Sequence, residues 1–369
     1  MNEMETDNVR PDNVRPTFLR ETLDYDLAEA LIAEKPTQRR QDARLLLIDR
    51  RSPSPVDRII ADLPDLLHPG DLLVLNNTKV LPAKFDAVRG TGGKVGGLFV
   101  DELKPKHWRV MLQGSSRLRE GETIALRAGK GSLNATLLQR EGEGLWEIQV
   151  HSSEPPHAIL DRFGQTPLPP YIRRKRRSVP AAPDDASRYQ TVYATHDGAI
   201  AAPTAGLHLT KDLLESMEDR GIEIAFVTLH VGIGTFRPIK TDDLADHDMH
   251  GERFDLPAET AARIIACRQR GGRIVAVGTT TVRVLESVAA LWGGWEHIQP
   301  TSGTTHAFIY PPYSFSCVDA LLTNFHLPGS TLLALVMAFA GVARTRSAYR
   351  HAIEARYRFY SYGDAMLIV

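Results

Sequence analysis

Hydrophobic and polar residues follow two different patterns along the chain, and the change of pattern divides it. Residues 44–50 (RLLLIDR) and 70–76 (GDLLVLN) are apolar runs of the length of buried strands. Between residues 82 and 154, short alternating runs such as HWRVMLQG and LWEIQVH are separated by glycine-containing turns. Strands of this length and spacing predict a small antiparallel barrel or sandwich.

From residue 167 onward, strand-like and helical patterns alternate. The runs EIAFVTLHVG and RIVAVG indicate buried strands, whereas residues 261–269 and 280–292 have helical periodicity. This alternation predicts an α/β fold with a mostly parallel sheet flanked by helices. We therefore predict an α/β domain of residues 22–81 and 160–369 into which a small antiparallel β-barrel domain, residues 82–159, is inserted.

The polar start and one long apolar stretch complete this pattern. Residues 1–21 contain a tandem DNVRP and no apolar segment of a signal peptide, which predicts a mobile leader. The longest apolar stretch, residues 330–343, is too short to cross a bilayer. It predicts a buried helix with Ser330 as its N-cap.

Composition narrows the classes of function. The 369 residues carry 44 Lys and Arg against 45 Asp and Glu, a net charge of −1. A protein coated by nucleic acid is usually more basic, so any RNA contact must come from a local patch. The two cysteines, Cys267 and Cys317, lack metal-site or disulfide spacing, which is typical of reduced thiols in the cytoplasm.

Polar and small residues recur where predicted strands end. In open α/β sheets, ligands bind beyond the carboxyl ends of the strands. Three such loops contain TLHVGIGTF, VGTTTVR and TNFHLPGST, and a fourth, AAPTAGLHLT, precedes a helix predicted near Lys211. We therefore expect the site at this edge of the α/β domain.

The glycine-containing loop TLHVGIGTFRP resembles the start of a dinucleotide fingerprint. Gly232 and Gly234 fit its first two glycines, but Arg237 occupies the third position and Pro238 follows. No helix is predicted until about Pro257, so helix amides would not meet a pyrophosphate, and a phosphate cofactor is disfavoured.

The GTTT turn at Gly278 either caps a helix or binds a carboxylate.

The histidines on these loops leave several roles open. HDMHGE brings His247, His250 and Glu252 together in sequence, but neither HExxH nor paired cysteine spacing occurs. Histidines scattered on loops more often form hydrogen bonds or transfer protons than bind metal. No GxSxG nucleophile motif is present.

One dense basic run stands out in PLPPYIRRKRR. Its five consecutive cations, Arg173, Arg174, Lys175, Arg176 and Arg177, follow prolines that favour an extended loop. This is either a solvated charge run or a local contact to the phosphates of a tRNA arm.

Taken in order, these segments resemble the S-adenosylmethionine:tRNA ribosyltransferase-isomerase family of queuosine biosynthesis. The resemblance covers residue 23 to the C-terminus. It rests on LDYDLAEALIAEKP, GDLLVLNNTKVLPAK, TGGKV, PLPPYIRR, RYQTVYA, AAPTAGLHLT, TLHVGIGTFRP, HDMHGE, VGTTTVRVLES, TNFHLPGSTLL and YRFYSYGDAMLI.

The resemblance implies both a fold and a reaction. The family has an α/β domain with an inserted β-barrel. Its members transfer and isomerise the ribosyl group of S-adenosylmethionine onto 7-aminomethyl-7-deazaguanine at the tRNA wobble position. The product is epoxyqueuosine, with adenine and methionine released and no metal required. The expected partners are S-adenosylmethionine as co-substrate and the anticodon arm of tRNA. The protein itself is expected to be a cytoplasmic monomer that does not contact a membrane.

This chemistry needs a general base, a proton donor for adenine and anchors for the methionine tail. Loop position and residue type select the candidates. The expected catalytic residues are His208, His230 and His326, with His250 and Glu252 as a relay and Asp364 as partner of a cation or ribose hydroxyl. The expected substrate contacts are Thr235, Thr279, Thr280, Arg283, Asn324 and Tyr362, of which Thr279, Thr280 and Arg283 are candidates to hold the methionine carboxylate.

Two other classes of function stay open at this point. A metal-dependent hydrolase would contain stoichiometric Zn or Mn. A non-catalytic RNA-binding protein would bind tRNA without releasing adenine from S-adenosylmethionine.

Overall fold

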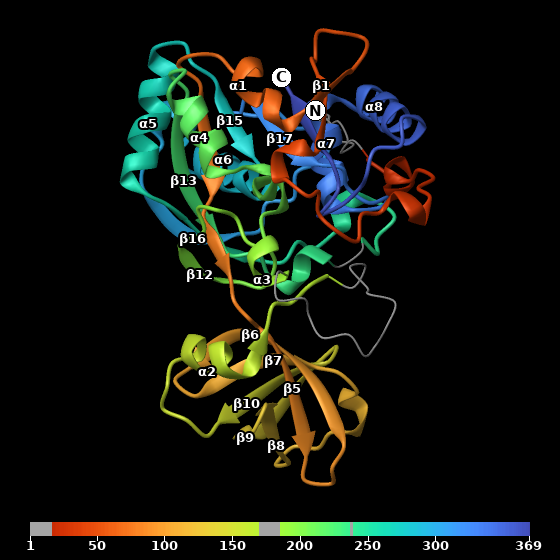
Figure 1. Cartoon of the computed structure of the whole chain (residues 1–369), viewed down its shortest axis with the longest axis vertical. Coiled ribbons are helices and arrows are strands. Elements are labelled where there is room, and N and C mark those ends of the chain that lie inside the picture. Colours follow the sequence, from red (N-terminus) through yellow and green to blue (C-terminus); the bar gives the residue numbers. More distant parts are fainter. Residues whose placement is uncertain (1–16, 170–184, 237–238) are drawn as a thin grey trace, which may run out of the picture.

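The computed structural model describes residues 17–169, 185–236 and 239–369 of the chain. Figure 1 shows two parts, a larger α/β part and a smaller β-barrel that lies at its lower end. The tandem DNVRP and the basic run at residues 173–177 lie outside the described residues. Of the segment expected to be a leader, residues 17–21 are described, and the Arg20 amide donates to the Asp242 carbonyl at 2.8 Å.

The α/β part is built on a nine-stranded sheet within the described residues. Its strand order is β16-β14-β13-β3-β15-β17-β18-β1-β2. The strands are β1 (Arg44–Ile48), β2 (Val56–Ile59), β3 (Leu72–Asn76), β13 (Glu223–Leu229), β14 (Glu252–Leu256), β15 (Ile274–Val277), β16 (Thr301–Thr305), β17 (Ala320–Asn324) and β18 (Ala365–Ile368).

The expectation of a mostly parallel sheet is wrong, because the sheet is mixed. Strands β13, β3, β15 and β17 run parallel to one another, and β18 pairs in parallel with β1. The β14–β16 pair and the β1–β2 pair are antiparallel, and β14 and β18 also lie antiparallel to β13 and β17. Antiparallel strands therefore extend the parallel centre on both sides.

Alternate residues of the central strands enter two separate hydrophobic cores. In β3, Leu72 and Val74 join the core of one face, whereas Leu73 and Leu75 join that of the other. All four side chains are at most 1% exposed. A sheet covered on both faces explains why these strands read as continuous apolar runs rather than as alternating ones.

Helices cover both faces of the sheet (Figure 1). One core includes residues of α5 (Ala258–Gln269), α6 (Thr279–Trp292), α7 (Thr331–Ala340) and α8 (Val342–Glu354). The other includes residues of α1 (Leu63–Leu66) and α4 (Lys211–Glu218). The predicted cap is confirmed, since the Ser330 hydroxyl accepts a hydrogen bond from the Leu333 amide at 3.2 Å.

The apolar stretch at residues 330–343 is not one continuous helix. Helices α7 and α8 meet at an angle of 113°. Gly341 stands between them with φ 88°, a backbone conformation that suits glycine because it has no Cβ. Within the described residues no single helix is long and apolar enough to span a membrane, although this bent pair meets the criteria when its two helices are combined.

The inserted part is a closed barrel rather than a sandwich. The strands β5 to β10 are Lys84–Arg89, Lys94–Lys104, His107–Leu112, Thr123–Ala128, Gly131–Gly142 and Leu145–Val150. They are antiparallel in the order β5-β6-β7-β10-β9-β8, and pairing of β5 with β8 closes the ring. Phe85, Trp108 and Trp146 fill the interior, and a Cβ at Gly97 would lie 2.1 Å from the Phe85 ring. The domain boundaries at residues 82 and 159 stay a prediction.

Short elements connect the two parts. Strand β4 (Thr78–Val80) pairs in parallel with β12 (His196–Ala199), and Lys79 forms an ion pair with Asp197 at 3.2 Å. Asp101 of the barrel accepts a hydrogen bond from Arg253 of the sheet at 3.2 Å. The other short elements are β11 (Gly164–Gln165), α2 (Pro156–Phe163), α3 (Asp185–Arg188), η1 (Arg20–Leu23), η2 (Glu29–Leu31), η3 (Arg40–Asp42), η4 (Ile60–Asp62), η5 (Ser115–Arg117), η6 (Thr204–His208), η7 (Ile233–Phe236), η8 (Leu244–Asp246) and η9 (Trp295–His297).

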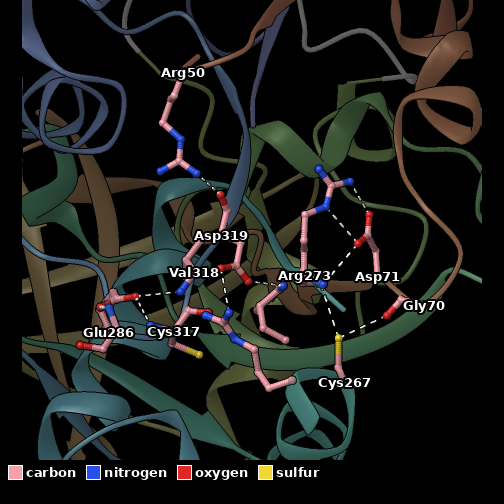
Figure 2. A network of polar contacts seen from close by, with 12 residues as sticks. Arg50, Gly70, Asp71, Cys267, Arg273, Glu286, Cys317, Val318 and Asp319 are labelled. Atoms are coloured by element: carbon pink, nitrogen blue, oxygen red, sulfur yellow. Dashed lines mark hydrogen bonds and ion pairs between the residues drawn. The ribbon is translucent and has the colours of Figure 1, made fainter. Parts of the chain in front are cut away.

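Polar groups at the amino edge of the central strands bond mainly to one another, as Figure 2 shows. Asp71, before β3, binds Arg273, before β15, at 2.6 and 3.0 Å. The Asp319 carboxylate accepts the Ile274 amide at 2.7 Å. These polar groups are therefore satisfied by one another within the protein.

Candidate active site

A pocket lies at the carboxyl edge of the parallel strands, where the sequence places the site. Its enclosed volume is about 60 Å³, and the pocket is partly open to solvent. All four expected loops contribute to its wall. The lining residues are Tyr189, Ala201, Ala202, Pro203, Thr204, Ala205, Val231, Gly278, Thr279, Thr280, Thr323, Asn324, His326, Leu332, Tyr360 and Ser361.

Asn76, the last residue of β3, holds three of the surrounding segments together. Its Nδ2 donates to the Leu229 carbonyl at 3.0 Å and to Thr280 Oγ1 at 3.2 Å. Its Oδ1 accepts the amides of Leu229 and Thr78 at 3.0 and 3.1 Å. A buried amide with every group engaged fixes the loops that it joins. The sequence did not single out Asn76, although its NNT segment lies at the end of a predicted strand.

Helix α6 begins at the pocket wall. Gly278 precedes it with φ 89° and no side-chain cap bond, and Thr279 and Thr280 line the pocket. The first amides of a helix have no partner within the helix and favour an anion. This wall therefore suits a carboxylate, and the role of Thr279 and Thr280 in holding one stays a prediction.

Asn324 and His208 lie together at the end of β17. Asn324 is 2% exposed, and its Nδ2 lies 3.2 Å from His208 Nε2 and 3.0 Å from the Tyr360 carbonyl. Burial, together with the nearby Arg358 and Arg40 guanidinium groups, lowers the pKa of His208 to about 4. His208 is therefore neutral at physiological pH and contacts the pocket through Asn324.

His326 is the one candidate acid–base residue among those lining the pocket. Its Nε2 lies 2.9 Å from Thr323 Oγ1. Its amide donates to the Tyr349 hydroxyl at 3.0 Å, and its carbonyl accepts from the Tyr25 hydroxyl at 2.5 Å. Burial lowers the pKa of His326 to about 3. The ring is therefore a neutral hydrogen-bonding group, and it is a weak proton acceptor near neutral pH.

His230 lies beside the pocket at the junction with the barrel. Its Nδ1 is 2.8 Å from Thr78 Oγ1, and its ring packs so closely on Gly198 that a Cβ there would lie 2.7 Å away. Burial, the Arg253 guanidinium and His196 lower the pKa of His230. Its neighbour Val231 lines the pocket, and the ring itself is half-buried.

Close packing on His250 accounts for one glycine of the GIG loop. A Cβ at Gly234 would lie 2.4 Å from the His250 ring, so only glycine fits without a shift. The loop continues into η7, which contains Thr235, and the first helix of eight residues or more that follows in the described residues is α5. The dinucleotide interpretation thus gains no support from the geometry.

Three predicted side chains are engaged in protein contacts away from the pocket lining. Arg283 of α6 and Glu252 of β14 form a buried ion pair, with side chains 4% and 3% exposed. The same guanidinium donates to the Ala307 carbonyl at 2.9 Å, and Glu252 also accepts the Gly232 amide at 3.0 Å. Asp364 accepts the amides of Arg44 and Arg358 at 3.0 and 2.8 Å.

These contacts correct the expected positions. Arg283 is turned to Glu252 and two carbonyl groups, so it is not at the pocket wall beside Thr279 and Thr280. Asp364 does have a cationic partner, Arg358 at 3.4 Å, but that partner belongs to the protein.

The pocket also contains residues that the sequence did not single out. Tyr189 lines the pocket, is fully buried and packs edge-on against the predicted contact Tyr362, with ring centroids 5.9 Å apart. Tyr360 and Ser361 line the wall, whereas Tyr362 borders a separate small cavity that also contains His208. The sequence feature that could have indicated these residues is the repeated tyrosine in the RYQTVYA and YRFYSYGDAMLI segments.

The described lining includes no Asp, Glu, Lys or Arg. Among the described residues, no group of three or more His, Cys, Asp or Glu is placed to hold a metal ion. Tyrosine, alanine, proline and leucine side chains instead give the pocket an apolar wall with a few hydroxyl and amide groups. That combination is typical of small-molecule sites.

Fold and site together define a mixed α/β protein with an inserted β-barrel and a pocket at the carboxyl edge of its sheet. Comparison with known proteins identifies the family within this class. The chain belongs to the family described as queuosine biosynthesis protein, whose profile matches residues 20–368.

Relatives match over nearly their whole length. The S-adenosylmethionine:tRNA ribosyltransferase-isomerase of Trichlorobacter lovleyi is 46% identical over 345 residues, covering 94% of this chain and 98% of the relative. The protein of the same name from Anaeromyxobacter sp. is 47% identical over 349 residues, 94% of this chain and 97% of the relative. The crystal structure of the Thermotoga maritima S-adenosylmethionine tRNA ribosyltransferase is 34% identical, with a TM-score of 0.53, and covers 94% of this chain and all of that one.

Proposed function

We propose that this protein is an enzyme that transfers and isomerises the ribosyl group of S-adenosylmethionine onto 7-aminomethyl-7-deazaguanine at the tRNA wobble position. The product is epoxyqueuosine, and adenine and methionine are released. One observation carries the proposal: the relatives that bear this name match from end to end. The convergence of four strand-end loops on one uncharged pocket supports it.

The pocket suits the donor in one orientation. Its apolar wall with Tyr189 and Tyr360 offers a surface for adenine, which is uncharged and planar. The amides at the start of α6, with Thr279 and Thr280, offer a site for the methionine carboxylate. The ribose and the sulfonium then lie between these groups.

The positions of the histidines favour His230 as the base. The sulfonium acidifies the adjacent ribose C5′, and a base removes its proton before adenine leaves, the aminomethyl nitrogen attacks and epoxide closure expels methionine. His230 is half-buried and is hydrogen-bonded to Thr78 of β4, one of the elements that connect the two parts. His326 is fully neutral and lines the pocket, so it suits a hydrogen bond to the donor.

We also propose that the protein binds the anticodon arm of tRNA. We expect it to be a monomer, to be located in the cytoplasm and to need no metal. The basic residues 173–177 stay the candidates for the phosphate contact.

The test is mass spectrometry of tRNA after incubation with the purified protein and S-adenosylmethionine. The tRNA must carry 7-aminomethyl-7-deazaguanine. We expect epoxyqueuosine to form, with one adenine and one methionine released per modified base and no effect of a chelator. The variant His157→Ala, on the exposed face of α2, serves as a control with unchanged turnover. Binding of tRNA without adenine release, or activity that a chelator abolishes, would contradict the proposal.

A further inference from the structure

Asn324 has one buried polar atom without a partner. Its Oδ1 forms no hydrogen bond with any described residue and is inaccessible to water, although the residue lines the pocket. Buried side-chain oxygens in proteins are nearly always hydrogen-bonded, so a lone one in a ligand pocket points to a donor on the ligand.

The orientation of this amide follows from its other contacts. The Tyr360 carbonyl, 3.0 Å away, only accepts hydrogen bonds, so the group facing it is the Nδ2 amino group. The oxygen of Asn324 must therefore be the unpartnered atom.

His208 fixes the same orientation from a second side. Because Asn324 Nδ2 is a donor, His208 Nε2 at 3.2 Å must be an unprotonated acceptor, and the ring proton is on Nδ1. The lowered pKa of His208, about 4, agrees with a neutral ring. The Nε2 lone pair is thus occupied, and His208 acts as a positioning residue for Asn324 rather than as a general base.

The residues that line the pocket limit which hydrogen-bond donor of a ligand could face Asn324 Oδ1. An ammonium group would find no carboxylate among the described lining residues. An exocyclic amino group on a planar, neutral ring satisfies Oδ1 and packs on the apolar wall formed with Tyr189 and Tyr360.

We infer that Asn324 Oδ1 accepts a hydrogen bond from the 6-amino group of the donor's adenine and that His208 holds Asn324 in this orientation. The inference rests on the proposed function. It makes Asn324 a specificity-determining residue, because a 6-oxo purine would place oxygen against oxygen and leave Oδ1 unpaired.

The experiment compares the binding of two donors by calorimetry without tRNA. One is S-adenosylmethionine and the other is its deaminated 6-oxo analogue. We expect the wild-type protein to prefer the amino donor by about 5- to 150-fold, the range for leaving a buried polar group unpaired. Asn324→Ala should reduce that preference to within about threefold, whereas Asn134→Ala, on the exposed face of the barrel, should leave it unchanged.

Variants of His208 test the positioning role. His208→Gln keeps an acceptor for Asn324 Nδ2 and should preserve the preference for the amino donor, whereas His208→Phe should lose most of it. Thermal melts confirm that each variant is folded. Since the wild-type comparison needs no substitution, an unstable variant leaves the test intact.

Several outcomes would overturn the inference. Equal binding of both donors by the wild type would do so, as would an unchanged preference in folded Asn324→Ala. A different result would be that Asn324→Ala keeps the preference against the 6-oxo donor and loses the preference against 2′- or 3′-deoxyribosyl donors. That result would assign Oδ1 to a ribose hydroxyl. A wild-type protein that neither binds S-adenosylmethionine nor releases adenine would instead refute the proposed function.

Discussion

Arg283 and Glu252 form an ion pair between helix α6 and strand β14, and both side chains are less than 5% exposed. This relationship gives the two residues a structural role at the border of the site. Arg283 also donates to the Ala307 carbonyl, so its guanidinium ties α6 to two neighbouring segments.

The first prediction concerns this pair. Glu252→Gln leaves a buried guanidinium without its counter-charge, and we expect the free energy of unfolding in urea to fall by about 3–5 kcal/mol. The matched control is Glu259→Gln, which removes an exposed pair with Arg263 on α5 and should cost less than about 1 kcal/mol. Equal effects of the two substitutions would contradict a structural role for the buried pair.

The second prediction concerns Glu286, which lies on α6 at the amino edge of the sheet (Figure 2). Its carboxylate accepts the amides of Ser316, Cys317 and Val318 at 2.8, 2.9 and 3.0 Å. Glu286→Gln removes the charge from these bonds, so we expect a loss of about 1.5–3 kcal/mol in urea unfolding. Because the pocket lies at the other edge, the affinity for S-adenosylmethionine should stay within about twofold. A large fall in affinity with unchanged stability would reverse this assignment.

Much of this architecture is visible in the sequence, for a physical reason. Parallel strands end at one edge of a sheet, so polar residues after β13, β15 and β17 had to converge, and they do. The direction of β18 was not predictable, because a fully buried apolar run has the same composition whether it runs parallel or antiparallel. Its pairing with β1, over 300 residues earlier, decides the direction.

The site was less predictable than the fold, because its side chains are assigned by distant partners. Asn76 bonds to Leu229 and Thr280, which are 153 and 204 residues away in sequence. Arg283 has the chemistry to bind a carboxylate, and the nearest carboxylate belongs to Glu252 of the protein itself. Residue type gave the chemistry in both cases, whereas burial and three-dimensional pairing decided its use.

The third prediction is a loss of stability on acidification. The folded-state pKa values of His208 and His326, about 4 and about 3, lie below the ordinary value of about 6.5. The unfolded chain therefore binds more protons below pH 6.5, and stability falls as the pH drops from there toward 4. We expect a loss of about 2 kcal/mol per histidine between pH 7 and pH 5. In urea unfolding, His208→Gln should lack the part of this pH-dependent loss that comes from His208. An identical pH dependence of stability in wild type and variant would contradict a lowered pKa for His208.

The last prediction separates the proposed base from the residues around it. His230→Ala should reduce adenine release by about 10²- to 10⁴-fold, the range for removal of a general base, while S-adenosylmethionine still binds. Thr78→Val removes the hydroxyl 2.8 Å from His230 Nδ1 and should cause a smaller loss, because the ring remains but its orientation is freed. The control is His196→Ala, an exposed histidine on β12 near His230, which should keep wild-type turnover.

The same set of variants also tests His326 as the alternative base. Single-turnover assays with saturating S-adenosylmethionine separate proton transfer from donor binding. If His326 only bonds to the donor, His326→Gln should weaken binding more than it slows turnover, since a neutral amide replaces a neutral ring. Wild-type rates in His230→Ala together with a large loss of turnover in His326→Gln would transfer the role of base to His326. In that case the deeply buried imidazole would have to gain basicity when the donor binds, because its pKa of about 3 otherwise leaves it a poor proton acceptor.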